Sequence, residues 1–141
     1  MAPDAVETKP TWEQYNAYVR NEECAAAIAV LECDPFGVVL ADAARWLRES
    51  PTRDGRYADG MFKPEPFLDW EAWVADVDQR GRGWSSTQWR LYQVAAGLAT
   101  GREFNIVGVL DRLNEWTRPV LMILIAWSTG GNAEKIRAAA Q

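Results

Sequence analysis

The chain has 141 residues, a formal net charge of −5, eight tryptophans and no histidine. A chain of this length suits one domain, which buries about 70% of the surface that its unfolded chain exposes, so no disulfide or metal is needed for stability. The lack of histidine excludes the Ser-His-Asp triad, the Cys-His dyad and every His-containing zinc site formed by this chain alone. We therefore expect no metal site and no cofactor.

Features that decide the cellular location point to the cytoplasm. Residues 1–7 have neither a basic head nor an apolar run, so they do not form a secretory signal. The longest apolar run, residues 120–127, is shorter than the roughly 20 residues that span a bilayer. Cys24 and Cys33 lie in one stretch of helical pattern about 13 Å apart, which disfavours a disulfide. We expect a cytoplasmic protein with free, buried thiols and no membrane contact.

The first third of the chain predicts two or three helices. Thr11 and Gln14 form a capping box that begins the first helix. Asn21 is placed to cap a second helix, although one continuous helix to Cys33 is also open. Asp34 and the proline after it are typical of a helix start, and the apolar spacing that follows predicts a helix to about residue 50.

The middle of the chain begins with a predicted loop. Residues 51–66 contain two Asp-Gly pairs and three prolines, and a long irregular segment of this kind is often functional. A helix is then predicted to end at Gly81 and Gly83, and a second capping box begins the next helix, which runs to Gly101. The apolar stripe of the former is Phe67, Trp70, Trp73, Val74 and Val77, and the capping box of the latter is Ser85 with Gln88.

The last third adds a short helix capped by Asn105 and the run at residues 120–127, which is apolar on every side. We predict that this run is a central buried helix rather than a strand, because no other segment supplies partner strands. The expected fold is all-α, a single compact multi-helix bundle of about five to seven helices. Its parts are a flexible N-terminal arm at 1–10, one helical domain at 11–131 and a C-terminal tail at 132–141. Four tryptophans in apolar stripes or runs are predicted to be core: Trp46, Trp70, Trp89 and Trp127.

Charge divides unevenly along the chain. Residues 1–78 carry 16 acidic and 7 basic side chains, a balance of −9, whereas residues 79–141 carry 4 acidic and 8 basic side chains, a balance of +4. Such asymmetry is typical of an acidic face offered to a basic partner, although solvated helix faces have the same composition.

Two glycine-bounded segments combine arginine with an aromatic residue at positions that no helical stripe requires. Arginine and aromatic residues are the commonest anchors of protein interfaces. The predicted partner-binding residues are therefore Arg53, Arg56, Tyr57, Phe62, Arg82 and Trp84. We assign no catalytic residue.

These observations predict a non-enzymatic protein-binding module, an inhibitor or adaptor that acts through an acidic surface on another protein with a basic surface. The sequence leaves open whether the protein forms a homo-oligomer. One alternative is a DNA-binding regulator that uses residues 85–114 as a helix-turn-helix, but its second helix offers only Arg112 as a cation, which disfavours nucleic acid. The other is a carboxylate-dependent hydrolase built on Glu22 and Glu23 or on Glu32 and Asp34.

Overall fold

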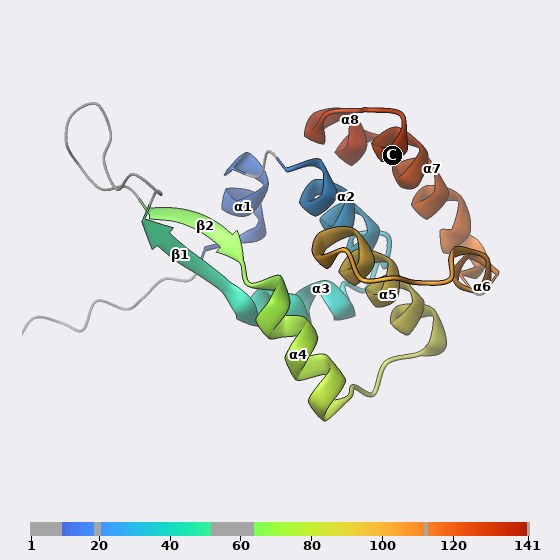
Figure 1. Cartoon of the computed structure of the whole chain (residues 1–141), viewed down its shortest axis with the longest axis horizontal. Helices are drawn as coiled ribbons and strands as arrows, with labels where there is room; N and C mark the ends of the chain where they lie inside the picture. Colours follow the sequence, from blue (N-terminus) through green and yellow to red (C-terminus); the bar gives the residue numbers. More distant parts are fainter. Residues whose placement is uncertain (1–9, 19–20, 52–63, 112, 141) are drawn as a thin grey trace, which may run out of the picture.

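The computed structural model describes residues 10–18, 21–51, 64–111 and 113–140. Within these residues the chain forms eight α-helices, two short 3-10 helices and one two-stranded sheet (Figure 1). The all-α class predicted from the sequence is confirmed. The small sheet was not predicted.

The N-terminal helices begin at the predicted caps. Gln14 and Thr11 cap each other reciprocally at the start of α1 (Trp12–Tyr18), with N···O distances of 2.9 and 3.2 Å. The Asn21 side chain accepts a hydrogen bond of 3.0 Å from the backbone of Cys24 and begins α2 (Glu22–Leu31). The two predicted helices are therefore separate. Cys24 and Cys33 are free thiols, each half-buried.

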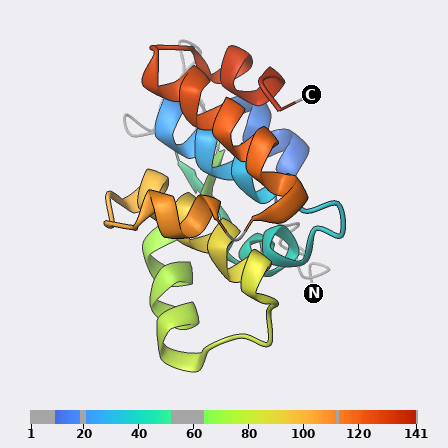
Figure 2. The same ribbon diagram turned by 90° about the vertical axis from the view of Figure 1, so that its right-hand side faces the viewer.

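Helix α2 is the centre of the fold. Residues 25–31 are all buried, and five of the ten residues of the helix are alanine or cysteine. Their small side chains let neighbours approach closely from more than one side. Helix α5 (Ser86–Thr100) lies along one side of α2, while α7 (Thr117–Ser128) and α8 (Ala133–Ala138) lie along the other (Figures 1 and 2).

The predicted position of residues 120–127 needs correction. They form a helix, α7, as expected, but this helix lies at the outside of the bundle. Only Val120, Ile123 and Leu124 are buried, because α2 and α8 cover one side of the helix. The opposite side keeps its apolar residues exposed to solvent: Leu121, Met122 and Ile125.

The helix predicted over residues 34–50 is also wrong. The Asp34 carboxylate accepts hydrogen bonds from the backbone of Phe36 and Val38, and Gly37 adopts a left-handed φ of 62°, so the chain turns before α3 (Val38–Ala43) begins. After a 3-10 turn, η1 (Ala44–Trp46), the chain extends as β1 (Leu47–Pro51). This strand pairs antiparallel with β2 (Pro64–Leu68), which includes Phe67, a residue predicted to be helical.

The remaining helices follow their local signals closely. Asp69 caps α4 (Trp70–Arg80) through a 3.1 Å hydrogen bond to Ala72, and Gly81 ends it. The predicted capping box begins α5, and Gly101, with φ at 77°, ends it. Asn105 caps α6 (Ile106–Leu110), and a 3-10 turn, η2 (Asn114–Trp116), precedes α7.

Of the four tryptophans predicted to lie in the core, the structure buries one. Trp70 is buried as predicted, whereas Trp46, Trp89 and Trp127 are half-buried and pack against the core from its edge. Trp73 is the tryptophan with no exposed surface among the described residues. The segment predicted to be a C-terminal tail contains α8, whose Ile136 is fully buried in the same core.

Candidate functional site

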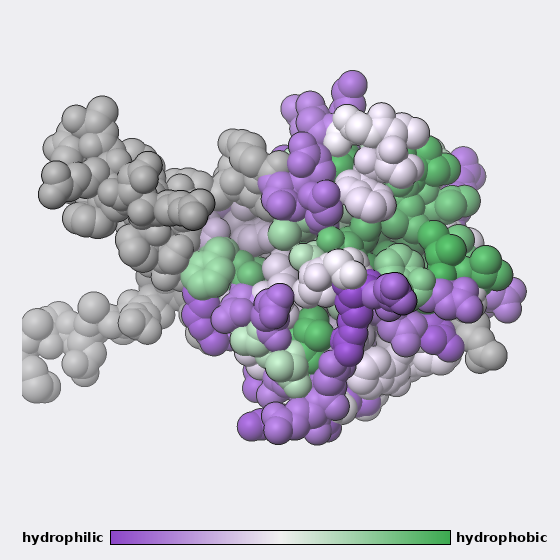
Figure 3. Space-filling model, in the orientation of Figure 1, coloured by the Kyte–Doolittle hydropathy of each residue, from purple (hydrophilic) through white to green (hydrophobic). Residues whose placement is uncertain are grey.

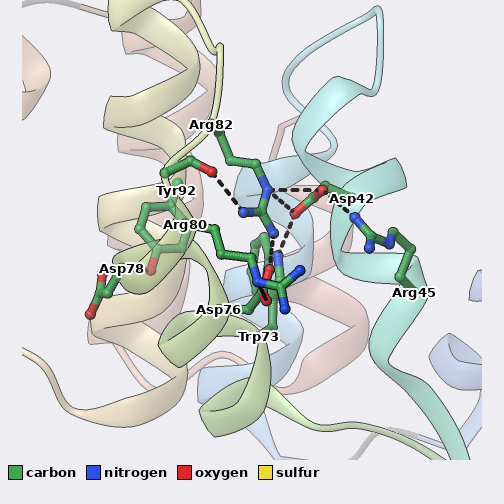
Figure 4. Close-up of polar contacts among 9 residues, drawn as sticks. Asp42, Arg45, Trp73, Asp76, Asp78, Arg80, Arg82 and Tyr92 are labelled. Carbon is green, nitrogen blue, oxygen red and sulfur yellow. Dashed lines mark hydrogen bonds and ion pairs between the residues drawn. The ribbon is translucent and has the colours of Figure 1, made fainter.

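Arg82, one of the predicted partner-binding residues, is bound within the fold. It follows the end of α4, and its side chain is only 12% exposed. The Nε atom donates to both carboxylate oxygens of Asp42, at 3.1 and 3.0 Å, and Nη2 donates to Asp76 at 2.6 Å (Figure 4). One guanidinium therefore ties α3 to α4 and to the segment that follows α4.

Three further groups join this ion-pair network, one of which is Arg45, paired with Asp42 at 3.5 Å (Figure 4). Trp73 donates its indole N–H to Asp42 at 2.8 Å, and Arg80 pairs with Asp76 at 3.1 Å from the solvent side (Figure 4). Burial lowers the pKa of Arg82, but the hydrogen bonds and charges of Asp76 and Asp42 outweigh burial and raise that pKa above its usual value. Arg82 therefore stays charged, and its guanidinium is already bound to Asp42 and Asp76.

Trp84, the other described candidate, belongs to an aromatic cluster. Its ring centroid lies 4.8 Å from that of Trp89 and 5.5 Å from that of Tyr92. The guanidinium carbon of Arg82 lies 5.9 Å from the Trp84 ring, so the two predicted residues do meet. Both residues are half-buried, and Trp84 packs against the core.

The other predicted binding residues lie outside the residues that the structure describes. They are Arg53, Arg56, Tyr57 and Phe62, all from the segment between β1 and β2. Their role in binding stays a prediction.

The uneven charge of the two halves is partly neutralised inside the molecule. Three arginines from residues 79–141 pair with three aspartates from residues 1–78. The pairs are Arg80 with Asp76, Arg82 with Asp42 and Asp76, and Arg102 with Asp78. Less acidic surface and less basic surface therefore remain for partners than the sequence predicted.

Three of the carboxylates considered for hydrolysis have structural roles. Asp34 is 3% exposed, and its oxygens accept the backbone N–H groups of the turn before α3. Glu22 and Glu23 lie in the first turn of α2, where acidic side chains favour the positive end of the helix dipole. Within the described residues, no three His, Cys, Asp or Glu side chains gather closely enough to hold a metal ion.

An exposed apolar surface on α6 and α7 was not predicted from the sequence. Eight large apolar side chains are strongly exposed in the described part of the chain, and five of them belong to these two helices. Both helices face the same side of the molecule (Figure 2), and hydrophobic side chains gather over them at the right of Figure 3. We call these residues the α6–α7 surface: Ile106, Val107, Leu121, Met122 and Ile125.

Acidic side chains border this surface. Asp111 follows α6 directly and Glu115 lies in the turn before α7; both are exposed, as is Glu103 ahead of α6. None of the three forms an ion pair with another described residue. Among the described residues 103–111 and 113–118, Glu103, Asp111 and Glu115 are the acidic side chains and Arg118 is the one cation. The run at 120–127 is apolar on every side, which is compatible with an exposed apolar face as well as with the buried helix predicted from it.

Comparisons of the chain with protein-family models, with curated proteins and with solved structures find no match in any of the three.

Proposed function

We propose that this protein is a binding module that engages another protein through the α6–α7 surface. The observation that carries the proposal is the cluster of five exposed apolar side chains on two adjacent helices. Soluble proteins seldom expose contiguous apolar patches without a partner to cover them. The acidic border, formed by Glu103, Asp111 and Glu115, suits a partner with an apolar centre and a basic rim.

The same geometry favours a protein partner over DNA. Helix α6 would be the recognition helix of the alternative helix-turn-helix, yet it spans five residues and exposes Ile106 and Val107. DNA binding also needs arginine side chains that are free to neutralise phosphates. Arg80, Arg82 and Arg102 are instead paired with aspartates.

Within this proposal the protein acts as an inhibitor or adaptor in the cytoplasm, and its acidic border attracts the basic rim of the partner. In the described residues, no helix combines the length and the apolar character that crossing a membrane requires. Electrostatic attraction of this kind mainly raises the association rate and weakens with added salt.

The test replaces one apolar residue in the surface and one outside it. Leu121→Lys places a charge at the centre of the α6–α7 surface, whereas Val38→Lys changes a residue of similar exposure on α3. Partners captured from the native host by the unmodified protein are identified, and the affinity of each variant for them is then measured. Leu121→Lys should weaken binding at least about tenfold, and Val38→Lys should leave it unchanged.

Two outcomes would contradict the proposal. Equal affinity of both variants would place the interface elsewhere. The second outcome is measured by sedimentation velocity. If the unmodified protein is a dimer, and Leu121→Lys makes it monomeric without changing the binding of partners, the surface joins two copies of the chain instead.

The segment between β1 and β2 provides a separate arm of the test. Arg56→Ala with Tyr57→Ala removes two of the predicted anchors. Weaker partner binding by this double variant would extend the interface to that segment, as the sequence predicts. Unchanged binding would restrict the interface to the α6–α7 surface.

A further inference from the structure

A pocket of about 500 Å³ opens between α5, the segment at residues 101–105 and α6. This volume lies within the range of small-molecule sites, roughly 300 to 1,000 Å³. The pocket is separate from the α6–α7 surface, since α6 lines it with Gly108 and Val109 and exposes Ile106 and Val107 to solvent.

Aromatic side chains form much of its wall, and the packing holds them in place. Trp89 and Tyr92 meet edge to face, with ring centroids 5.8 Å apart. Phe104 lies directly over Gly97, where a Cβ atom would overlap its ring. Because Gly97 has no side chain, the Phe104 ring sits against the backbone of α5. The pocket is therefore preformed, and it presents the rings of Trp89 and Phe104 beside polar side chains such as Gln93.

One wall of the pocket also carries an unmatched donor. The Nη1 atom of Arg90 donates to Gln93 at 2.9 Å, but its Nε atom is buried and has no hydrogen-bond partner in the described structure. Buried donors without partners are rare in native proteins, because leaving one unmatched is costly. A guanidinium with a free donor is best matched by a carboxylate oxygen.

The other charged groups of the pocket do not satisfy Arg90. Asp78 is held by Arg102 through two hydrogen bonds, at 2.5 and 3.2 Å. Glu103 is exposed and forms no ion pair with a described residue, so its charge is solvated and opposes an incoming anion. Arg90 is thus the cation that remains for a ligand among the described lining residues.

From the aromatic walls and the unmatched Arg90 donor we infer that this pocket binds a small aromatic carboxylate. The ring lies against Trp89 and Phe104, and the carboxylate accepts from the Arg90 guanidinium. The ligand is a free metabolite-sized acid or the C-terminal aromatic residue of a peptide, since both present the same ring and carboxylate.

The test uses 1-naphthoate as the probe and 1-naphthamide as its neutral counterpart. Calorimetry should give 1-naphthoate a dissociation constant of about 1 mM or tighter, as expected for a ligand of this size, and at least about tenfold weaker binding of the amide. The Trp89 indole N–H resonance, assigned with a Trp89→Phe variant, should shift when the acid is added. A peptide ending in phenylalanine and its C-terminal amide then separate the two sources of ligand.

Two variants with opposite expected effects make the test specific. Arg90→Met should weaken 1-naphthoate binding at least about tenfold, whereas Arg118→Met, outside the pocket, should not change it. Glu103→Gln removes an exposed opposing charge and should strengthen binding a few-fold. If circular dichroism shows that the Arg90→Met variant does not fold, the Glu103→Gln variant and the comparison with the amide test the inference instead. The inference is overturned if 1-naphthoate does not bind, if the amide binds equally, or if Glu103→Gln leaves the affinity of the acid unchanged.

Discussion

Arg82 and Asp42 lie 40 residues apart in the chain, yet Arg82 Nε contacts both carboxylate oxygens of Asp42 within 3.1 Å. Both side chains are less than 15% exposed. The contact joins the segment between α4 and α5 to α3, and Trp73 donates to the same carboxylate from the core (Figure 4). Removing one member would leave a poorly solvated charge without its partner.

Arg82→Ala should therefore lower the free energy of unfolding by about 2 to 4 kcal/mol, since Asp42 and Asp76 both lose their most buried cationic partner. Arg80→Ala is the matched control, because Arg80 also pairs with Asp76 but is 73% exposed, and its loss should cost less than about 1 kcal/mol. Urea unfolding followed by circular dichroism measures both. Similar losses for the two variants would show that the network contributes only as surface charge.

Gly97→Ala tests the close packing of Phe104 on α5. The added Cβ would lie 2.9 Å from the carbonyl oxygen of Arg102 and closer still to the Phe104 ring, so we expect a loss of about 1 to 3 kcal/mol. Gly108→Ala is the control, since its Cβ would meet only Asn105, at 3.6 Å, and alanine is the better helix former. The Gly97→Ala, Phe104→Ala double variant should lose less than the sum of its single changes. Strict additivity in thermal melts would argue against the contact.

The raised pKa of Tyr92 predicts that the folded protein loses stability at high pH. Burial, aided by the charge of Asp78, raises the pKa of Tyr92 to about 12, above its ordinary value of 10.0. The unfolded chain therefore releases this proton at a lower pH than the folded protein does. The contribution of Tyr92 is complete below pH about 10 and is lost as pH rises through about 12, by up to roughly 2 to 3 kcal/mol. Urea titrations across this range should show a shallower decline for Tyr92→Phe than for the unmodified protein; parallel declines would contradict the assignment.

Trp70→Ala and Trp127→Ala compare a buried tryptophan with a half-buried one. Trp70 is 7% exposed and packs against Trp73, with ring centroids 5.6 Å apart, so its truncation should cost about 3 to 5 kcal/mol. Trp127 lies at the edge of the core, and we expect its truncation to cost roughly half as much. Differential scanning calorimetry ranks the two. The reverse order would mean that α7 is anchored more firmly than its exposed face implies.

The sequence by itself determined the local features of this protein. Caps such as Thr11, Asn21, Ser85 and Asn105 act within three residues of their own position, so their hydrogen bonds depend little on the rest of the fold. Apolar spacing near 3.6 residues likewise reports a helix wherever enough turns follow. The all-α class and the starts of α1, α2, α5 and α6 followed from these signals.

Tertiary structure decided which apolar segments are buried and which charges are matched. Residues 120–127 are more uniformly apolar than the alanine-rich α2, yet α2 occupies the centre because small side chains allow neighbours to approach from both sides. The β1–β2 pairing and the Arg82 contact with Asp42 join residues far apart in sequence, which no local pattern specifies. The α6–α7 surface and the pocket beside Arg90 arise in the same way, from what the packed helices leave uncovered or unmatched.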